Sequence, residues 1–415
     1  MCRLIAASTL LLASQLAFAA DNWPQFRGPR GDGHSDSKRL ALTWDSQKYV
    51  RWKTPIHGRG WSSPVIWNEQ IWLTTATADG HKYYALCLDR RRGDLVHDLH
   101  LFDVELPQPI AAMNSYASPT PVIEEGRVYV HFGTYGTACI KTDTGQVLWT
   151  RRDLNCDHHE GAGSSPILVD NLLIFNVDGR DVQYVVALDK LTGKTVWKTD
   201  RSVDFSDVRP DLRKCYGTPI VIESGGQRQL ISVGARAMMA YEVATGKEIW
   251  KVTYSGWSIA PRPVFGQGLI FMINAYINPE LWAVKPGGQG DVTATNVVWK
   301  HTKTMPSRPS PLLVNDLLFV VSSDGVATCL EAKFGDVVWQ ERLGGKFSAS
   351  PLYARGRVYF FDEQSVTTVV EASRQFNRLA VNSMNNEELM ASPAVAGDSL
   401  FIRTASHLYR IDEPK

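Results

Sequence analysis

The strongest constraint on the fold is a four-strand unit that the chain repeats, seen most clearly between Ser165 and Trp197. Three short apolar runs in this unit have the length and the β-branched or aromatic bias of strands, and a fourth run ends on Trp197. Asp178-Gly179 and similar polar pairs between the runs are turn signals. Four strands joined by tight turns make one small antiparallel sheet, and neither face of such a sheet can be buried by the unit alone.

A Ser-Pro or Thr-Pro pair marks the start of each copy. Proline at the first residue of a strand loses no ladder hydrogen bond, which explains why it can recur there. The interval between markers runs from 40 residues (310 to 350) to 57 residues (63 to 120). The eight markers, one of which has arginine in the hydroxyl position, are Ser63-Pro64, Thr120-Pro121, Ser165-Pro166, Thr218-Pro219, Arg262-Pro263, Ser310-Pro311, Ser350-Pro351 and Ser392-Pro393.

Most copies close on a tryptophan, and His97 and Leu379 take its place in the first and seventh copies. A Thr-Gly pair precedes several of these tryptophans, and glycine there supplies the positive φ of a tight turn. One large side chain per copy at one position is what packing between neighbouring sheets demands. We therefore assign a structural role to Trp52, Trp149, Trp197, Trp250, Trp299 and Trp339.

The ends of the repeat array complement each other. The last copy stops at Asp412 after three strands, and an unpaired strand at 49–53, which contains Trp52, precedes the first copy. We therefore predict an all-β, eight-bladed β-propeller of four-stranded antiparallel blades over residues 49–415. Pairing of the N-terminal strand with the C-terminal blade would close the ring. Residues 20–48, rich in Gly, Pro, Asp and Ser, are predicted to be an irregular segment.

Residues 1–19 have the pattern of a secretory signal peptide: Arg3, a mainly apolar stretch, and a small-x-small motif ending at Ala19. We therefore expect an exported protein, periplasmic or extracellular, cleaved near Ala19. Cleavage removes one of 44 basic residues, Arg3, and leaves 43 against 43 acidic residues. This neutral balance argues against nucleic acid as a partner. No later apolar run reaches the roughly 18 residues that a transmembrane segment needs.

Five cysteines remain after cleavage. Cys87, Cys139 and Cys329 lie inside strand-like runs and are interpreted as buried small apolar residues. Cys156 and Cys215 lie in predicted loops. Because export permits disulfides, a Cys156–Cys215 disulfide and two free thiols are both open alternatives.

The Ser-Pro opening, the Asp-x-x-Thr-Gly-x-x-x-Trp closing and the eight copies resemble the PQQ-like (quinoprotein) β-propeller repeat family over about residues 49–412. The N-terminal WPQFRGPRGDGHS is also similar to that of secreted PQQ-like repeat proteins. The resemblance implies two kinds of function. Quinoprotein dehydrogenases hold pyrroloquinoline quinone (PQQ) and calcium on the ring axis, whereas the outer-membrane assembly factor BamB uses the same ring as a non-catalytic binding scaffold. A shared fold does not decide between them.

In this family the segment before each Ser-Pro leads into the inner strand of the next blade, so the resemblance places these segments around one mouth of the axial channel. Aromatic side chains interleaved with cations suit a flat anionic ligand, because rings stack on it and arginine pairs with carboxylates. The alternative is that eight such loops expose some arginine and aromatic residues in any case. The candidate ligand-binding residues are Arg59, Trp61, Tyr116, His158, His159, Glu160, Arg213, Tyr216, Trp257, Arg262, Arg308 and Lys346.

Asp157-His158-His159-Glu160 is the densest group of potential metal ligands. Successive histidines on an extended chain point in opposite directions, so at most one would serve a single ion, and no metal site is predicted. No cofactor is predicted either. PQQ with calcium is the alternative, but the chain has no adjacent cysteine pair and, at 415 residues, lacks the long inserted loops of the dehydrogenases.

We therefore predict a non-catalytic, monomeric propeller that serves as a scaffold for a protein or glycan partner, or another ligand, at one face of the ring. The alternative is a PQQ- or metal-dependent, quinoprotein dehydrogenase-like enzyme that uses the axial channel. We assign no catalytic residues, since the sequence has no Gly-x-Ser-x-Gly, Walker or His-Glu-x-x-His motif.

Overall fold

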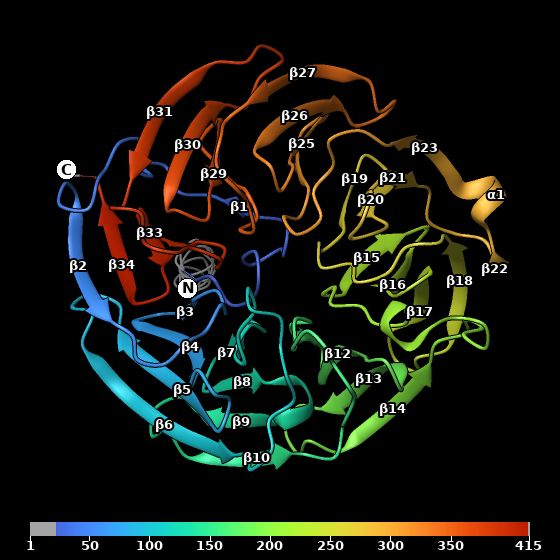
Figure 1. Cartoon of the computed structure of the whole chain (residues 1–415), viewed down its shortest axis with the longest axis horizontal. Coiled ribbons are helices and arrows are strands. Elements are labelled where there is room, and N and C mark those ends of the chain that lie inside the picture. The colour runs from blue at the N-terminus through green and yellow to red at the C-terminus, as the bar shows by residue number, and fades with distance from the viewer. Residues whose placement is uncertain (1–21, 414–415) are drawn as a thin grey trace, which may run out of the picture.

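The predicted eight-bladed propeller is confirmed by a computed structural model, which describes residues 22–413. Within this range the strands form eight separate sheets that follow one another around a ring (Figure 1). The predicted signal peptide, residues 1–19, lies outside the described residues. No helix in 22–413 is long and apolar enough to cross a membrane.

Each blade begins with a short inner strand and continues outward through three antiparallel strands. Blade 1 consists of β3 (Val65–Trp67), β4 (Gln70–Ala76), β5 (Lys82–Asp89) and β6 (Leu95–Asp103). Blade 2 consists of β7 (Val122–Glu124), β8 (Arg127–His131), β9 (Thr137–Lys141) and β10 (Val147–Arg151), with the 3₁₀ turn η2 (Gly133–Tyr135). Blade 3 consists of β11 (Ile167–Val169), β12 (Leu172–Asp178), β13 (Gln183–Asp189) and β14 (Thr195–Asp200). Blade 4 consists of β15 (Ile220–Ser224), β16 (Gln227–Val233), β17 (Ala237–Glu242) and β18 (Glu248–Thr253), preceded by η3 (Pro210–Leu212).

The second half of the ring repeats this construction with two additions. Blade 5 consists of β19 (Val264–Gly266), β20 (Leu269–Ile273), β21 (Leu281–Val284) and β23 (Val297–His301), with α1 (Thr293–Asn296) before its last strand. Blade 6 consists of β24 (Leu312–Val314), β25 (Leu317–Val321), β26 (Val326–Glu331) and β27 (Val337–Arg342). Blade 7 consists of β28 (Leu352–Ala354), β29 (Arg357–Phe361), β30 (Val366–Glu371) and β31 (Arg378–Ser383). The additions are β22 (Gly290–Asp291), which extends blade 4, and β1 (His34–Ser35), which extends blade 7.

Blade 8 joins the two ends of the described chain. Its inner strands are β32 (Ala394–Ala396), β33 (Ser399–Arg403) and β34 (His407–Asp412), and β2 (Val50–Pro55) is the fourth. β2 pairs antiparallel with β34, which places Trp52 opposite Arg410 and Thr54 opposite Leu408. The N-terminal strand therefore closes the ring in the way that the strand count predicts.

The Ser/Thr-Pro markers are joined to one another around the axis. The backbone N–H of one marker donates to the side-chain hydroxyl of the marker in the next blade. The first series runs through Ser63, Thr120, Ser165 and Thr218, and the second through Arg262, Ser310, Ser350 and Ser392, with N···O distances of 2.9 to 3.0 Å. Since these residues are buried, each hydroxyl satisfies an inner-strand amide that would otherwise lack a partner.

The recurring tryptophans pack each blade onto the next. Trp149 of blade 2 donates its indole N–H to the Lys190 carbonyl of blade 3 at 3.0 Å. A Cβ on Gly193, in the same turn, would lie 2.7 Å from the indole, so the turn needs glycine for its positive φ and for the close approach. Trp52, Trp197, Trp299 and Trp339 likewise donate to a carbonyl of the following blade, whereas Trp250 donates to Gln229 in its own blade.

The N-terminal segment, residues 22–45, lies across one end of the ring. Trp23 is 2% exposed and forms an antiparallel bridge with Ile66 at the end of the blade 1 inner strand. β1 pairs in parallel with β28 in blade 7, where Figure 1 shows it near the centre of the ring. The segment therefore covers the axis at the end opposite to the Ser/Thr-Pro markers.

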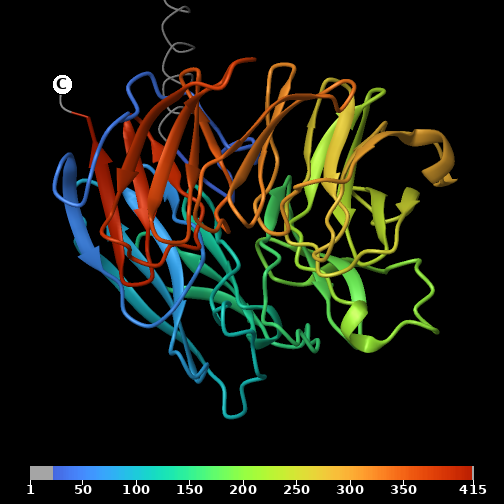
Figure 2. The ribbon, with the colours of Figure 1, turned by 45° about the horizontal axis from the view of Figure 1, so that its top comes forward.

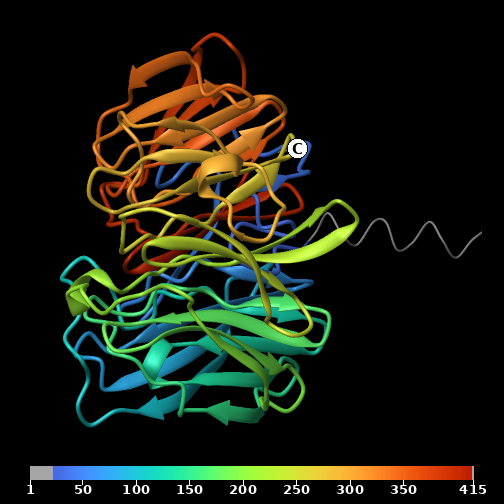
Figure 3. The same ribbon diagram turned by 90° about the vertical axis from the view of Figure 1, so that its right-hand side faces the viewer.

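The two faces of the ring differ in their loops. The long segments before β7 and β15 extend from the same side of the ring (Figure 2). In the edge-on view of Figure 3, η3 lies on one side and the C-terminus on the other. We call the side that carries these two segments and the Ser/Thr-Pro markers the mouth face.

Candidate functional site

The segment between β6 and β7, residues 104–121, is held over the mouth face by three of the predicted ligand-binding residues. Trp61 donates its indole N–H to the Met113 carbonyl at 3.0 Å, and Arg59 donates to the Ala112 carbonyl at 2.9 Å. The Arg59 guanidinium also lies over the Trp61 ring, 5.1 Å from its centroid. From the other side of the ring, Arg308 Nη1 lies 3.8 Å from Met113 Sδ. These three residues therefore position a loop, and that loop builds the site.

A cavity of about 180 Å³ lies beside this loop, and we call it the mouth pocket. Most of its surface is apolar, because aromatic, thioether and small side chains dominate the wall. The pocket is lined by Ala111, Met113, Asn114, Ser118, Glu160, Ala162, Gly163, Tyr216, Ser258, Ala260 and Tyr276. Of the twelve predicted ligand-binding residues, the structure brings Glu160 and Tyr216 together in this lining.

Glu160 is fixed in the pocket wall by its neighbours. The Tyr216 hydroxyl donates to Glu160 Oε2 at 2.8 Å, and the Asn114 amide donates to the Glu160 carbonyl at 2.7 Å. Lys214 Nζ lies 3.7 Å from Glu160 Oε1, and burial lowers the pKa of Lys214, with Glu160 opposing that shift. Burial, and then Glu160, raises the pKa of Tyr216. Tyr216 is therefore a neutral hydrogen-bond donor, and Glu160 presents an oriented acceptor at the pocket.

Ser258 lines the pocket, and its buried side-chain hydroxyl has no partner in the described part of the chain. The residue is 4% exposed, and its Oγ has no hydrogen-bond partner among residues 22–413. Its backbone is left-handed, with φ of 54°, a conformation that non-glycine residues seldom adopt. A buried hydroxyl without a partner costs free energy.

The two histidines of the Asp-His-His-Glu run are separated, as expected for successive residues. His158 is 8% exposed, and its Nε2 accepts the Thr134 backbone N–H at 3.0 Å. Burial lowers the pKa of His158 to about 4, so this histidine is neutral at pH 7. His159 is exposed, with φ of 63°.

The alternative of a Cys156–Cys215 disulfide is not realised, because both cysteines are free thiols. Cys156 Sγ lies 3.4 Å from the imidazole nitrogens of His158. Cys215 Sγ lies against the carbonyls of Val233 and Ile259, at 3.3 and 3.2 Å. Burial raises the pKa of both thiols, which makes them structural rather than reactive groups.

Arg262 requires a correction to its predicted place at the mouth. The side chain is 3% exposed and points toward the N-terminal segment, where Nη1 donates to the Phe26 carbonyl at 2.7 Å. Its Nε donates to the Pro219 carbonyl at 3.2 Å, and burial lowers its pKa to about 9. This marker position carries arginine in place of a hydroxyl residue, and its side chain holds residues 22–45 against the ring.

The other predicted residues lie apart from the mouth pocket. Tyr116 is 9% exposed and donates its hydroxyl to the Gln108 carbonyl at 2.8 Å. Trp257 lines a separate cavity of about 600 Å³ between blades 4 and 5. Arg213 donates Nε to a backbone carbonyl of its own loop, and Lys346 is exposed.

The residues of the mouth pocket do not fit PQQ with calcium. The lining contains no arginine or lysine to pair with an anionic quinone, and Glu160 is its one carboxylate. Its volume of about 180 Å³ is below the roughly 300 Å³ at which small-molecule sites begin. In the part of the chain that the structure describes, no group of three His, Cys, Asp or Glu residues could hold a metal ion.

Nine of the eleven lining residues were not predicted from the sequence, and Met113, Ser258 and Tyr276 are among them. One signal for the loop was available, because the interval between Ser63 and Thr120 is the longest in the repeat array. Ser258 and Tyr276 lie in different segments of the blade 4–blade 5 region. They meet at the mouth only in the folded protein, so no local sequence pattern marks them as site residues.

Comparison with known families identifies the class of protein. Residues 103–286 and 181–413 match the family described as Outer membrane protein assembly factor BamB. These matches together cover more than half of the chain. The chain therefore belongs to the PQQ-like, BamB-type β-propeller repeat family.

Two curated proteins are similar to part of the chain. Methanol dehydrogenase (cytochrome c) subunit 1 of Methylobacterium organophilum is 28% identical over 156 residues, and that of Methylorubrum extorquens is 27% identical over 156 residues. Each match covers 33% of this chain and 23% of the relative. The match thus spans less than a quarter of each relative's length.

Two solved structures show the same fold over most of the chain. BamB from Moraxella catarrhalis has a TM-score of 0.61 at 11% identity, covering 87% of this chain and 99% of that chain. Quinohemoprotein alcohol dehydrogenase from Comamonas testosteroni has a TM-score of 0.69 at 10% identity, covering 97% of this chain and 83% of that chain. At such identities the likeness concerns the fold alone.

Proposed function

We propose that this protein is an exported, non-catalytic binding scaffold whose mouth pocket receives an apolar side chain of a protein partner. The observation that carries this proposal is the lining of the pocket, in which apolar walls surround a few polar groups, chiefly the oriented carboxylate of Glu160. This is the general form of a recognition site. An apolar anchor would fill the pocket, and a donor beside it would pair with Glu160.

The surroundings of the pocket favour a protein over a glycan. Ile277 is 58% exposed, and Tyr276 and Met113 are each 38% exposed. Grouped apolar side chains with a polar rim mark protein interaction sites, and aromatic anchors carry much of the binding energy in such sites. The pocket volume of about 180 Å³ suits one side chain better than a whole cofactor.

Export is the second part of the proposal. The signal-peptide pattern of residues 1–19 supports a periplasmic or extracellular place of action. We propose that the ring acts there as a monomer and offers its mouth face to the partner.

Site-specific photo-crosslinking tests the scaffold function. We would place 4-benzoylphenylalanine at Met113 in the full chain, irradiate cells of the native host, and identify adducts by mass spectrometry. The matched control is the same substitution at Leu191, which is 50% exposed in the outer turn of blade 3. A discrete protein adduct at Met113 and none at Leu191 is expected. If both positions give the same adducts, or neither gives one, the proposed function is wrong.

The enzyme alternative has its own test. Addition of PQQ with calcium to the purified protein should leave the melting temperature and the visible spectrum unchanged, because the pocket lining has no cation for the quinone. A saturable rise in melting temperature would favour the dehydrogenase-like alternative.

A further inference from the structure

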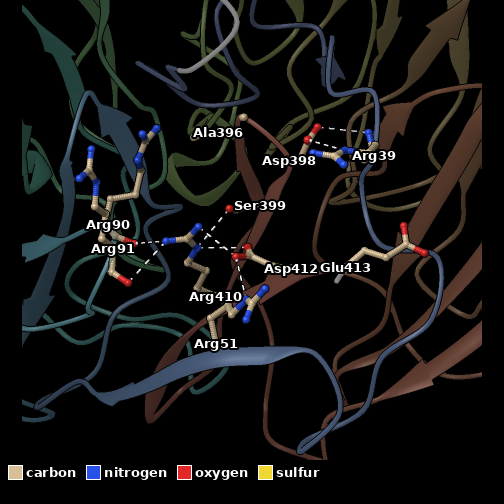
Figure 4. Close-up of a pocket in the computed structure, with 11 residues that line it drawn as sticks. Arg39, Arg51, Arg90, Arg91, Ala396, Asp398, Ser399, Arg410, Asp412 and Glu413 are labelled. Carbon is tan, nitrogen blue, oxygen red and sulfur yellow. Dashed lines mark hydrogen bonds and ion pairs between the residues drawn. The ribbon is translucent and has the colours of Figure 1, made fainter. Parts of the chain in front are cut away.

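A second cavity, of about 490 Å³, lies where the ring closes. Its wall is formed by the start of β2, the ends of β32 and β34, the 89–94 turn of blade 1, and Arg39 from the N-terminal segment. These strand ends are opposite to the Ser/Thr-Pro markers, so this cavity is on the other face from the mouth pocket. Figure 4 shows that it is rich in arginine. We call it the closure pocket.

Two of its arginines share one carboxylate. Arg51 Nε lies 3.2 Å from Asp412 Oδ2, and Arg410 Nη2 lies 2.9 Å from the same oxygen. Arg410 is held rigidly, because its Nη1 donates to the Arg90 carbonyl at 3.1 Å and its Nε to Ser399 Oγ at 3.1 Å. One negative charge thus faces two positive charges in this part of the wall.

The opposite wall repeats the arrangement. Arg91 Nε lies 2.8 Å from Glu69 Oε2, and Arg90 Nη2 lies 3.2 Å from Glu69 Oε1. Again two guanidinium groups share a single carboxylate. Several like charges beside one cavity repel one another, and an anion in the cavity would relieve that repulsion.

Arg39 completes the wall and has unused hydrogen-bond donors on its guanidinium group. Its backbone N–H and its Nε both donate to Asp398, at 3.2 and 3.1 Å. The terminal nitrogens of Arg39 and of Arg51 donate to no residue in the range 22–413. Glu413 also lines the cavity, but Figure 4 shows its carboxylate turned away from Arg410.

We propose that the closure pocket binds an oxyanion group, a phosphate or sulfate monoester. Five guanidinium groups lie at the cavity, and the four carboxylates that line it or pair with its arginines are Asp398, Asp412, Glu413 and Glu69, so cations outnumber anions among these residues. Guanidinium pairs oxyanions through two parallel hydrogen bonds, and Arg39 and Arg51 have both terminal nitrogens available for this. A volume of about 490 Å³ exceeds a bare oxyanion, so the group is carried on a larger polar molecule.

The test uses the purified mature chain and inorganic phosphate or sulfate, with sodium chloride at equal ionic strength as the reference. We expect a saturable rise in melting temperature and one-to-one binding by calorimetry. The double variant Arg39→Gln/Arg51→Gln should weaken binding by about ten-fold or more. The matched control is Arg228→Gln, since Arg228 is 48% exposed and paired to a single carboxylate, Asp170, at 3.0 Å.

Because Arg51 lies on the closing strand, a second variant guards against a folding defect. Arg91 is 74% exposed, so Arg91→Gln should keep the fold, as judged by circular dichroism, and still weaken binding. Absence of phosphate and sulfate binding would overturn the proposal. Equal binding by the wild type and by both pocket variants would overturn it as well.

The carrier of the anionic group is identified by two further arms. One compares glucose 6-phosphate with glucose, and the other compares vesicles of phosphatidylcholine and phosphatidic acid with vesicles of phosphatidylcholine alone. Tighter binding than to inorganic phosphate in one arm assigns a soluble ester or a lipid headgroup. If neither carrier binds as tightly as inorganic phosphate, the inferred larger ligand is wrong.

Discussion

Replacement of Ser165 by alanine tests the hydrogen-bonded series that joins the blades around the axis. Ser165 Oγ accepts the Thr120 backbone N–H at 2.9 Å, and both residues are 3% exposed. The variant leaves this buried amide without a partner, whereas the bond from the Ser165 N–H to Thr218 Oγ1 at 3.0 Å remains. An unpaired buried donor costs about 1–3 kcal/mol. We expect the free energy of unfolding of Ser165→Ala to fall by about that amount.

Urea denaturation of residues 20–415, followed by tryptophan fluorescence, measures this loss. Ser202→Ala is the matched control, because Ser202 is exposed and its Oγ donates to Glu248 at 2.6 Å. It should change stability by no more than about 0.5 kcal/mol. Ser165→Thr should cost much less stability than Ser165→Ala, since the threonine hydroxyls of Thr120 and Thr218 accept the equivalent backbone N–H. If Ser165→Ala costs no more than Ser202→Ala, the series does not stabilise the ring.

Three further predictions concern other buried contacts. Arg201 and Asp178 form a fully buried ion pair with two bonds of 2.6 Å. Arg201→Met should therefore lower the free energy of unfolding, measured by urea denaturation, by about 3–5 kcal/mol, and a loss below about 1 kcal/mol would contradict this. Burial lowers the pKa of His158 from 6.5 to about 4, so its contribution to stability is complete above pH 6.5 and declines by about 1.4 kcal/mol per pH unit as the pH falls toward 4. His158→Gln should make the stability less dependent on pH over this window, and an unchanged slope would refute the assignment. Trp61→Phe removes the indole donor to the Met113 carbonyl, so hydrogen exchange should speed up in that loop while the urea midpoint stays nearly constant; unchanged exchange would show that the bond does not hold the loop.

The fold could be predicted from the sequence because each blade contains the local sequence signals that define it. Short apolar runs, turn glycines and a closing tryptophan recur within each copy, and these signals act between residues that are close along the chain. The count of copies then required the strand that contains Trp52 to pair with the last blade, as it does through Arg410. The Thr-Gly turn was explained only in part, since its glycine also makes room for the indole of the preceding blade.

The site was predictable as a region and not as a set of residues. The family resemblance implied that Glu160 and Tyr216 lie at one mouth, and the structure brings both into the mouth pocket. The sequence could not show that Arg59 and Arg308 hold a loop in place. Nor could it show that Arg262 turns inward to the Phe26 carbonyl, because residues 22–45 carry no repeat signal that would place them on the ring.

What the sequence by itself determined is the blade, the number of blades and the way the ring closes. All three follow from local patterns repeated at regular intervals, and the Ser/Thr-Pro marker shows the principle. Its proline is explained by its own strand, but its hydroxyl serves an amide in the neighbouring blade, at least 40 residues away along the chain. Only the tertiary structure decided which side chains meet at the mouth and at the closure of the ring, because such meetings depend on how distant segments pack and leave no periodic trace in the chain.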